Sequence, residues 1–373
     1  MHSVLHRLAG PGGPTGRPAR GGRRAGGRRR GVGDVRDPAA DLRRIAFCLE
    51  RALEPSYRIK AFRTAAATVD ASDRADLERR ALTGSLEDLK GIGKVTAQVI
   101  TESLAGEEPN YLRRVESIGL SPVARQADEL RQLLKGDCHV HSDWSDGGSP
   151  IEEMAVAARD LGHEYMVLTD HSPRLTVARG LSPERLREQL DVVAEINERM
   201  APFRILTGIE CDINLDGSLD QEPDLLARLD VVVASVHNKL RMSADEMTPR
   251  MVAAISNPHT DILGHCTGRL VTGRGRPESE FDAEVVFAAC AQFDVAVEIN
   301  SRPERLDPPK RLLRLAVEAG CKVSIDTDAH APGQLSWQPL GCERAVLCGV
   351  PPESIVNARS ADQLLSWTRA AAG

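Results

Sequence analysis

Residues 137–147, DCHVHSDWSDG, begin as a short β-strand pattern and end in a polar loop. His139 and His141 are two residues apart, so on a strand both side chains point to the same face. Asp146 follows in the loop at 142–148. Imidazole and carboxylate groups gathered at the end of one strand are typical of a transition-metal site.

Six more short apolar runs follow the first, at 165–169, 205–213, 231–236, 261–264, 295–299 and 323–325. Amphipathic helical patterns lie between most of them, for example at 151–161, 183–200 and 309–319. Regular alternation of strand and helix predicts an α/β fold with a parallel sheet and helices outside it. Seven cycles in about 235 residues favour a closed or nearly closed TIM-like barrel over an open sheet.

A histidine or an acidic residue lies within or directly after most of these runs. In a barrel the carboxyl ends of all strands meet at one rim, where enzyme sites are found. The predicted metal ligands are His139, His141, Asp146, His171, Glu210, His237, His265, Asp328 and His330. Nine ligands are too many for one tetrahedral ion but suit three divalent ions if a carboxylate bridges two of them. The donor types favour zinc, manganese or iron.

Three such ions bring six positive charges, against three negative charges from Asp146, Glu210 and Asp328. The excess attracts an anion and stabilises the charge that develops on a phosphoryl group during hydrolysis. Water activated by the metal ions is the expected nucleophile. The residues therefore predict a metal-dependent phosphoesterase.

The charge of the chain is unevenly distributed. Residues 1–36 contain nine arginines and one acidic residue, so this end carries +8 within a chain of net −6, and the rest carries −14. Because residues 1–38 are Arg- and Gly-rich with almost nothing to bury, we predict a disordered tail. Such a tail either holds nucleic acid by charge or is a solvated segment without a task.

No apolar run approaches the ~18–20 residues that span a bilayer, and no secretory signal pattern follows the first basic residues. We therefore expect no membrane segment and a cytoplasmic location. Between the tail and the first strand, Leu42, Ile45, Leu49 and Leu53 recur at helical spacing, and a helical segment is predicted for residues 39–134.

The chain resembles the polymerase and histidinol phosphatase (PHP) superfamily from about residue 136 onward. The motifs are DCHVHSDWSDG at 137–147, LTDHS at 168–172, GIE at 208–210, SVH at 235–237, GH at 264–265 and DTDAH at 326–330. The resemblance implies a distorted (β/α)7 barrel at 135–373 with three ions. By this resemblance, the three ligand sets are His139, His141, Glu210 and Asp328, then Glu210, His237 and His265, then Asp146, His171 and His330. Glu210, Asp328 and His330 are the predicted catalytic residues.

The phrases ARGLS at 178–182, DGSLD at 216–220 and NPHTDILGHCTGRL at 257–270 are similar to the PHP domain of bacterial family X DNA polymerases. In that group the domain acts as a 3′→5′ exonuclease, which implies DNA 3′ ends as substrate. Arg269 and Arg302 are expected near the rim, where they would grip phosphate.

Residues 89–94, LKGIGK, followed by a helical pattern, resemble a helix-hairpin-helix of the same polymerases. Gly91, Gly93 and Lys94 are the predicted DNA contacts, because backbone N–H groups at the start of a helix bind phosphate. Only about 30 residues separate Gly106 from Gly136, where those polymerases place their nucleotidyl-transfer domain, so we expect no polymerase activity.

Three functions fit these observations to different degrees. The leading one is a DNA 3′-end-processing phosphoesterase whose helix-hairpin-helix domain at 39–134 holds DNA. The alternative is a phosphatase for a small phosphate ester of the histidinol phosphate type. A non-catalytic DNA-binding regulator is disfavoured, because a degenerate site would have lost some of its nine ligands.

Overall fold

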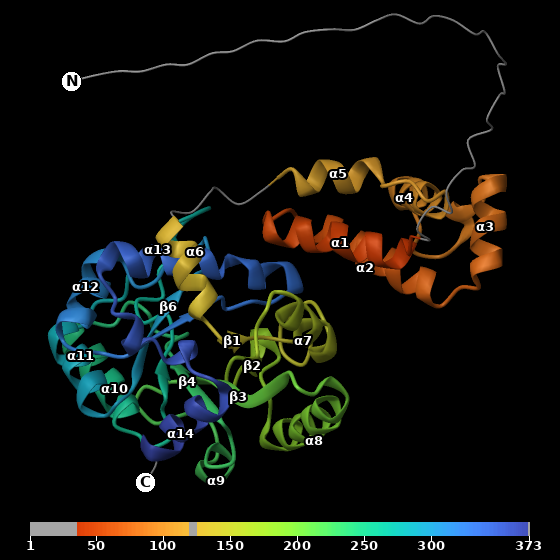
Figure 1. Ribbon diagram of the computed structural model, residues 1–373. Coiled ribbons are helices and arrows are strands. Elements are labelled where there is room, and N and C mark those ends of the chain that lie inside the picture. Colours follow the sequence, from red (N-terminus) through yellow and green to blue (C-terminus); the bar gives the residue numbers. More distant parts are fainter. Residues whose placement is uncertain (1–35, 119–124, 372–373) are drawn as a thin grey trace, which may run out of the picture. The chain divides into compact units, whose positions relative to one another are not determined.

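A parallel seven-stranded sheet forms the centre of the larger part of the chain (Figure 1). The structure is a computed structural model and describes residues 36–118 and 125–371. The strands pair in chain order: β1 (Gly136–Val140), β2 (Tyr165–Leu168), β3 (Arg204–Asp212), β4 (Val231–Ser235), β5 (Ile262–Leu263), β6 (Ala296–Asn300) and β7 (Val323–Asp326). Every strand boundary lies within one residue of the prediction.

The sheet closes on itself between its first and last strands. Val140 and Ala329 form a parallel bridge, and the His141 amide donates a hydrogen bond to the Ala329 carbonyl at 2.8 Å. The contact is a single bridge rather than a full ladder, so the barrel is nearly closed. The predicted (β/α)7 barrel is therefore confirmed.

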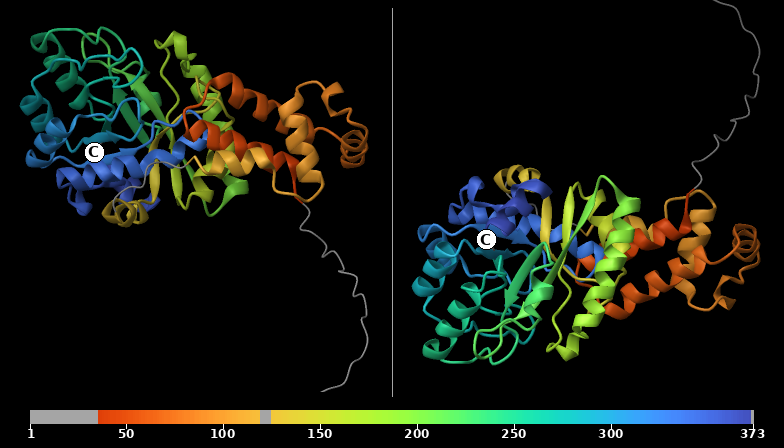
Figure 2. Two further views of the ribbon diagram at one scale, coloured as in Figure 1. Left: turned by 90° about the horizontal axis from the view of Figure 1, so that it is seen from above. Right: turned by 90° about the horizontal axis from the view of Figure 1, so that it is seen from below.

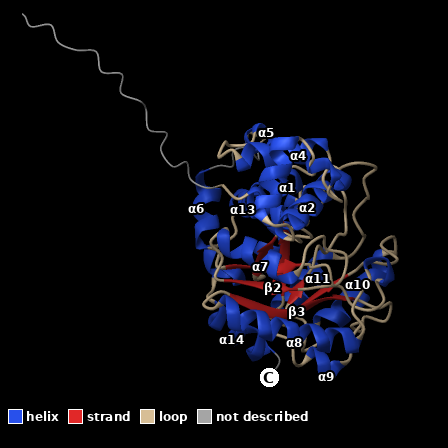
Figure 3. Ribbon diagram, turned by 90° about the vertical axis from the view of Figure 1, so that its right-hand side faces the viewer, coloured by secondary structure: helices blue, strands red, loops and turns tan. Residues whose placement is uncertain are grey.

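Helices surround the strands, as Figure 3 shows with the strands in red. They are α7 (Ile151–Asp160), α8 (Pro183–Met200), α9 (Pro223–Leu226), α10 (Ala244–Ile255), α11 (Ala283–Gln292), α12 (Lys310–Glu318), α13 (Gln338–Cys348) and α14 (Ala361–Ala371). Their apolar faces bury the outward-facing strand residues, as where Met154 of α7 and Val193 of α8 pack with Met166 of β2. This is the layering that the alternating pattern predicts.

The two ends of the barrel interior differ in polarity. Near the amino ends of the strands, Tyr165, Val231 and Ile262 pack in one apolar cluster with Leu364 and Trp367 of α14. This cluster closes that end with apolar side chains. The imidazoles and carboxylates lie at the carboxyl ends, so the fold leaves one rim for chemistry.

The helical segment consists of α1 (Pro38–Arg51), α2 (Ser56–Asp70), α3 (Arg74–Thr83), α4 (Lys94–Leu104) and α5 (Asn110–Glu116), shown in red and orange in Figure 2. Leu42, Ile45 and Leu49 are buried in its core, as their spacing predicts. Leu53 is not: it is 42% exposed and has a φ of 54°, because α1 ends at Arg51.

Helix α6 (Arg125–Leu133) packs with the barrel, although the sequence placed it in the helical segment. Its Ala127 and Leu130 share an apolar cluster with Ile325 of β7 and Ala345 of α13. Periodicity locates the buried face of a helix but does not identify what covers that face. The predicted disordered tail lies outside the described residues, apart from its last three. No helix in residues 36–118 or 125–371 has both the length and the apolarity that a membrane crossing requires.

The turn before α4 is built on Gly91 and braced by α2. Gly91 has a φ of 91°, and a Cβ added there would lie 2.7 Å from Thr64 Cγ2. The Thr68 hydroxyl donates to the Lys90 carbonyl at 3.0 Å. Gly93 differs, because its φ is −110° and an added Cβ would meet nothing within 4 Å. The turn therefore requires glycine at position 91, whereas position 93, just before the start of α4, has room for a side chain.

We predict opposite outcomes for the same substitution at these two glycines. Gly91→Ser forces a side chain into left-handed backbone and against Thr64, and it should lower the free energy of unfolding by at least about 1 kcal/mol. Gly93→Ser places a good N-cap residue in open space and should leave stability unchanged or slightly higher. Urea unfolding followed by circular dichroism measures both. Equal stability of the two variants would show that the turn has been misassigned.

Candidate metal centre

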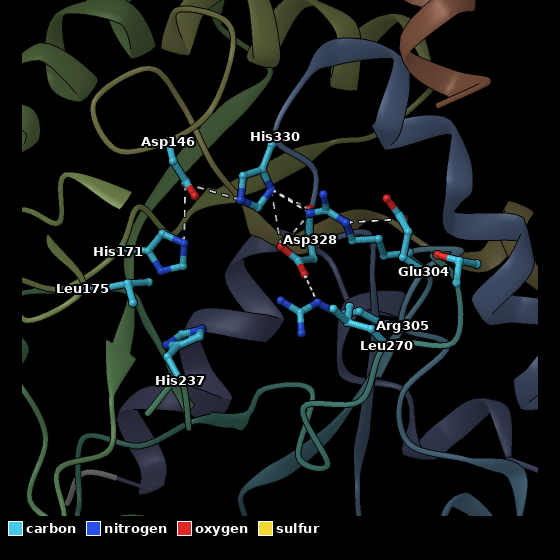
Figure 4. A pocket seen from close by; sticks show the side chains of 11 residues that line it. Asp146, His171, Leu175, His237, Leu270, Glu304, Arg305, Asp328 and His330 are labelled. Carbon is cyan, nitrogen blue, oxygen red and sulfur yellow. Dashed lines mark hydrogen bonds and ion pairs between the residues drawn. The ribbon is translucent and has the colours of Figure 1, made fainter. Parts of the chain in front are cut away.

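Nine side chains meet at the carboxyl rim of the barrel, and they are the nine that the sequence predicted as ligands. Each lies at or just after the end of a strand: His139, His141 and Asp146 after or within β1, His171 after β2, Glu210 in β3, His237 after β4, His265 after β5, and Asp328 and His330 after β7. Figure 4 shows the part of this cluster that faces the adjoining cavity.

Glu210 is the centre of the cluster. Its Oε2 lies 3.3 Å from His139 Nε2 and 3.5 Å from His141 Nε2. Its Oε1 lies 2.8 Å from His265 Nε2 and 3.1 Å from His237 Nε2. The two oxygens of one carboxylate thus face different sets of imidazoles, which is the arrangement that a bridging ligand requires.

A second group surrounds Asp146. Its Oδ1 lies 3.4 Å from His171 Nε2 and 3.3 Å from His330 Nε2. Asp328 Oδ1 lies 3.4 Å from His141 Nε2, which connects this carboxylate to the first group. Donor atoms that lie within 4.8 Å of one another form three overlapping groups: His141, Asp146, His171 and His330; His139, His141 and Glu210; and His171, Glu210 and His237. The division into the three ligand sets that the resemblance implies stays a prediction. His171 also places its Nδ1 2.9 Å from Glu210 Oε2, so it stands between two sets.

Many polar atoms of the cluster are buried without a hydrogen-bond partner in the described part of the chain. They are Nε2 of His139, His141, His237 and His265, Nδ1 of His141, His171 and His265, and both carboxylate oxygens of Glu210. An unsatisfied buried polar group costs about 1–3 kcal/mol, so this concentration points to partners other than protein groups. Bonds of about 2.0–2.2 Å to a shared ion place neighbouring donor atoms about 3.0–3.5 Å apart. The residues therefore fit divalent metal ions.

The charges of the cluster favour ionised carboxylates. Burial alone would raise the pKa of Glu210, but His237, His139 and His171 hold this pKa well below its usual value. Burial acts in the same way on Asp328, where Arg305 and His141 keep the pKa low. Burial lowers the pKa of His237, but Glu210 and Asp212 outweigh it and raise the pKa to about 9. Both carboxylates are thus available as anionic ligands at neutral pH.

Outer polar groups hold several imidazoles in place. Glu298 Oε1 lies 2.7 Å from His139 Nδ1, and Asp212 hydrogen-bonds to His237 Nδ1. Asn300 donates to Asp328 at 3.2 Å and to Glu298 at 3.3 Å. A carboxylate behind a ligating imidazole sets its tautomer and orientation and raises its basicity. The sequence prediction missed these three residues, although strand alternation places Asp212 on the Glu210 face and Asn300 on the Glu298 face.

A cavity of about 490 Å³ opens beside the cluster, and its wall includes Arg302 and Arg305. Figure 4 shows Arg305 beside Asp328 in this wall. Arg302, a predicted phosphate-binding residue, therefore lies where it was expected. Arg305 was missed, because it stands in a loop without a periodic pattern. Its Nε lies 3.0 Å from Asp328 Oδ2, and its buried Nη1 makes no hydrogen bond in the described structure.

The prediction that Arg269 grips phosphate needs correction. Arg269 does not line the cavity. Its Nε donates to the Arg305 carbonyl at 3.0 Å, its Nη2 donates to the Leu306 carbonyl, and its Nη1 lies 3.5 Å from Glu278 Oε1. Its guanidinium is thus occupied in holding the loop that carries Arg305.

Family models match two regions of the chain. A PHP domain model matches residues 137–302, and a helix-hairpin-helix domain model matches residues 35–109. The first region contains seven of the nine cluster residues, and the second contains the turn at 90–93.

Two curated relatives each match somewhat less than two thirds of the chain. The DNA polymerase/3′-5′ exonuclease PolX of Bacillus subtilis is 40% identical over 232 residues, which are 62% of this chain and 40% of that protein. A probable phosphatase of Caldicellulosiruptor bescii is 28% identical over 250 residues, which are 64% of this chain and 96% of that protein.

Among solved structures, the histidinol phosphate phosphatase of Lactococcus lactis, complexed with zinc, L-histidinol and phosphate, is similar with a TM-score of 0.42. It is 20% identical, and the match covers 57% of this chain and 92% of that one. The family models and the Bacillus relative agree with the observed barrel and helical segment. The chain therefore contains a PHP domain preceded by a helix-hairpin-helix domain, and its PHP region is similar to that of the Bacillus PolX protein.

Proposed function

We propose that the protein is a metal-dependent phosphoesterase whose site is the rim cluster around Glu210. The observation that carries the proposal is the convergence of buried, unpaired imidazole and carboxylate atoms at coordination distances beside an arginine-lined cavity. The PHP-domain match and the phosphatase and exonuclease relatives support the same class of reaction.

Three ions are proposed, because the nine side chains divide into three sets with Glu210 shared. When bound, zinc, manganese or iron ions acidify water and neutralise the charge that develops on a phosphoryl group. Glu210, Asp328 and His330, the predicted catalytic residues, would serve as ligands in this arrangement. Asp328 and His330 also line the cavity, where a substrate would meet them.

The arginines of the cavity wall would bind the substrate phosphate. Burial alone would lower the pKa of Arg305, but Asp328 and Glu210 raise it above its usual value, so the guanidinium stays charged. Its unpaired Nη1 is a donor ready for a phosphate oxygen. Arg302 Nη1 lies 3.1 Å from His330 Nδ1, so phosphate held by Arg302 would lie next to a proposed ligand.

The proposed natural substrate is a DNA 3′ end, with the helical segment as the grip. The exposed Lys90 and Lys94 flank the Gly91 turn, and neither has an ion-pair partner among the described residues. By contrast, Arg43, Arg58 and Arg74 of the same segment each pair with an acidic side chain. The N–H groups of the first turn of α4 have no intrahelical acceptor and can bind phosphate.

A small phosphate ester is the second candidate substrate. A cavity of about 490 Å³ accommodates such a molecule, and the Caldicellulosiruptor relative, named a probable phosphatase, aligns over 96% of its own length. The two substrates make different demands on the helical segment, so variants outside the barrel separate them.

We predict that His237→Ala and Asp328→Ala each lower kcat for para-nitrophenyl phosphate by at least about 100-fold. Loss of a residue that only hydrogen-bonds to a metal ligand already costs about 10- to 100-fold, and loss of the ligand itself should cost more. His259→Ala, which changes a histidine outside the cluster, is the matched control and should retain wild-type kcat. Steady-state kinetics with Mn²⁺ present measures all three. Wild-type turnover in His237→Ala would mean that the site lies elsewhere.

We predict that Lys94→Ala raises KM for cleavage of duplex DNA with a recessed 3′ end. The slope of the logarithm of DNA affinity against the logarithm of salt concentration should also become shallower by about 1, the value for one lost phosphate contact. Arg74→Ala also removes one positive charge from the segment, but that charge is paired with Glu78 at 3.0 Å and lies outside the turn. It should leave DNA cleavage unchanged.

The comparison uses labelled DNA, histidinol phosphate and para-nitrophenyl phosphate as parallel substrates. If Lys94→Ala and Arg74→Ala cleave DNA equally well, the turn before α4 does not bind DNA. Rapid hydrolysis of histidinol phosphate without any cleavage of DNA would establish the second candidate instead.

A further inference from the structure

The last turn of α1 is joined to the short 3-10 helix η3 (Pro332–Trp337) by a buried carboxylate. Glu50 of α1 is 2% exposed and accepts a hydrogen bond from the Gly333 amide at 2.9 Å. The same carboxylate accepts two bonds from Arg63 of α2, both at 2.9 Å. Glu50 therefore connects both first helices of the helical segment to a loop of the barrel.

Close packing accompanies this bond. A Cβ added at Gly333 would lie 2.1 Å from the Phe47 carbonyl oxygen, so only glycine allows the two backbones to approach this closely. The indole of Trp337, which is fully buried, donates to the Arg51 carbonyl at 3.0 Å. Both ends of η3 are thus held by α1.

Two routes of contact lead from η3 to His330. The side chain of Gln334 accepts a hydrogen bond from the His330 amide at 2.8 Å. The Arg302 guanidinium lies 5.9 Å from the centre of the Trp337 ring, and its Nη1 lies 3.1 Å from His330 Nδ1. The backbone and the imidazole of His330 are therefore each tied to the element that α1 holds.

His330 belongs to the most exposed of the three proposed ligand sets. Its side chain is 18% exposed and that of Asp146 is 37% exposed, compared with 1% for Glu210. Both residues stand in loops, whereas Glu210 lies within β3. Ligands must be held within about 0.5 Å of the productive geometry, and loops alone hold them less accurately than strands.

Resting on the proposed metal centre, we propose that docking of α1 on η3 positions His330 and thereby retains the ion held by Asp146, His171 and His330. Glu50 is a positioning residue, because it acts through η3 and touches neither ion nor substrate. The helical segment thus has a second task besides gripping DNA: it completes the metal centre of the barrel.

The test uses two full-length variants, one on each side of the contact between α1 and η3. Glu50→Gln keeps the shape of the side chain but replaces one acceptor with a donor, and Gly333→Ala forces η3 away from Phe47. Glu78→Gln, in an exposed pair with Arg74 on α3, is the matched control. Circular dichroism checks the fold, and equilibrium dialysis with Mn²⁺ gives the number and affinity of bound ions.

We expect both interface variants to bind the weakest ion about 10- to 100-fold less tightly than wild type, as is usual when a group behind a ligand is lost. Their kcat for para-nitrophenyl phosphate should fall in parallel and recover with excess Mn²⁺, while their circular dichroism spectra without metal stay the same as that of wild type. Glu78→Gln should bind and turn over as wild type does.

If both folded variants bind every ion with wild-type affinity, the proposal is wrong. The only role left to the helical segment would then be the proposed binding of DNA. If Gly333→Ala does not fold, the isosteric Glu50→Gln decides. Less than one bound ion in wild-type protein contradicts the proposed metal centre itself, so the two failures are distinguishable.

Discussion

The buried carboxylate of Glu210 is the group on which the functional rim depends. A carboxylate that is 1% exposed is costly unless positive or donor groups surround it. Imidazoles from the ends of four other strands lie within 2.8–3.3 Å of its two oxygens. The barrel makes this possible, because β3 stands between neighbours on both sides and the carboxyl ends of all strands converge. The same convergence leaves more unpaired donor atoms than protein contacts can satisfy, which is why divalent ions are the natural partners.

Two kinds of support hold this centre, and they differ in rigidity. Strand residues Glu298 and Asp212 fix the imidazoles of His139 and His237 from behind. The His330 amide instead donates a hydrogen bond to Gln334 of η3, and η3 is itself held by Glu50 of α1. The part of the centre nearest the cavity is therefore also the part connected to the helix-hairpin-helix domain. The proposed DNA grip and the proposed support of the metal centre would therefore belong to one structural unit.

Strand alternation and motif spacing were sufficient to predict the barrel, all seven strands and the nine converging side chains. They succeeded because the side-chain period of a strand and the common direction of parallel strands are local and regular. Of the two arginines predicted to bind phosphate, Arg302 lines the cavity and Arg269 does not, and Arg305 was missed. Loop conformation decides which arginine reaches the cavity. The packing of α6 on α13 and the bond between Glu50 and Gly333 join residues far apart in the sequence, and no periodic pattern encodes such contacts.

Anomalous X-ray scattering from crystals grown with Mn²⁺ or Zn²⁺ tests the central claim most directly. Data collected on both sides of the metal absorption edge locate each ion without assuming its ligands. The account predicts three anomalous peaks at the rim, two of them sharing Glu210 and the third between Asp146, His171 and His330. Absence of any peak within bonding distance of Glu210, in crystals soaked with either metal, would contradict it.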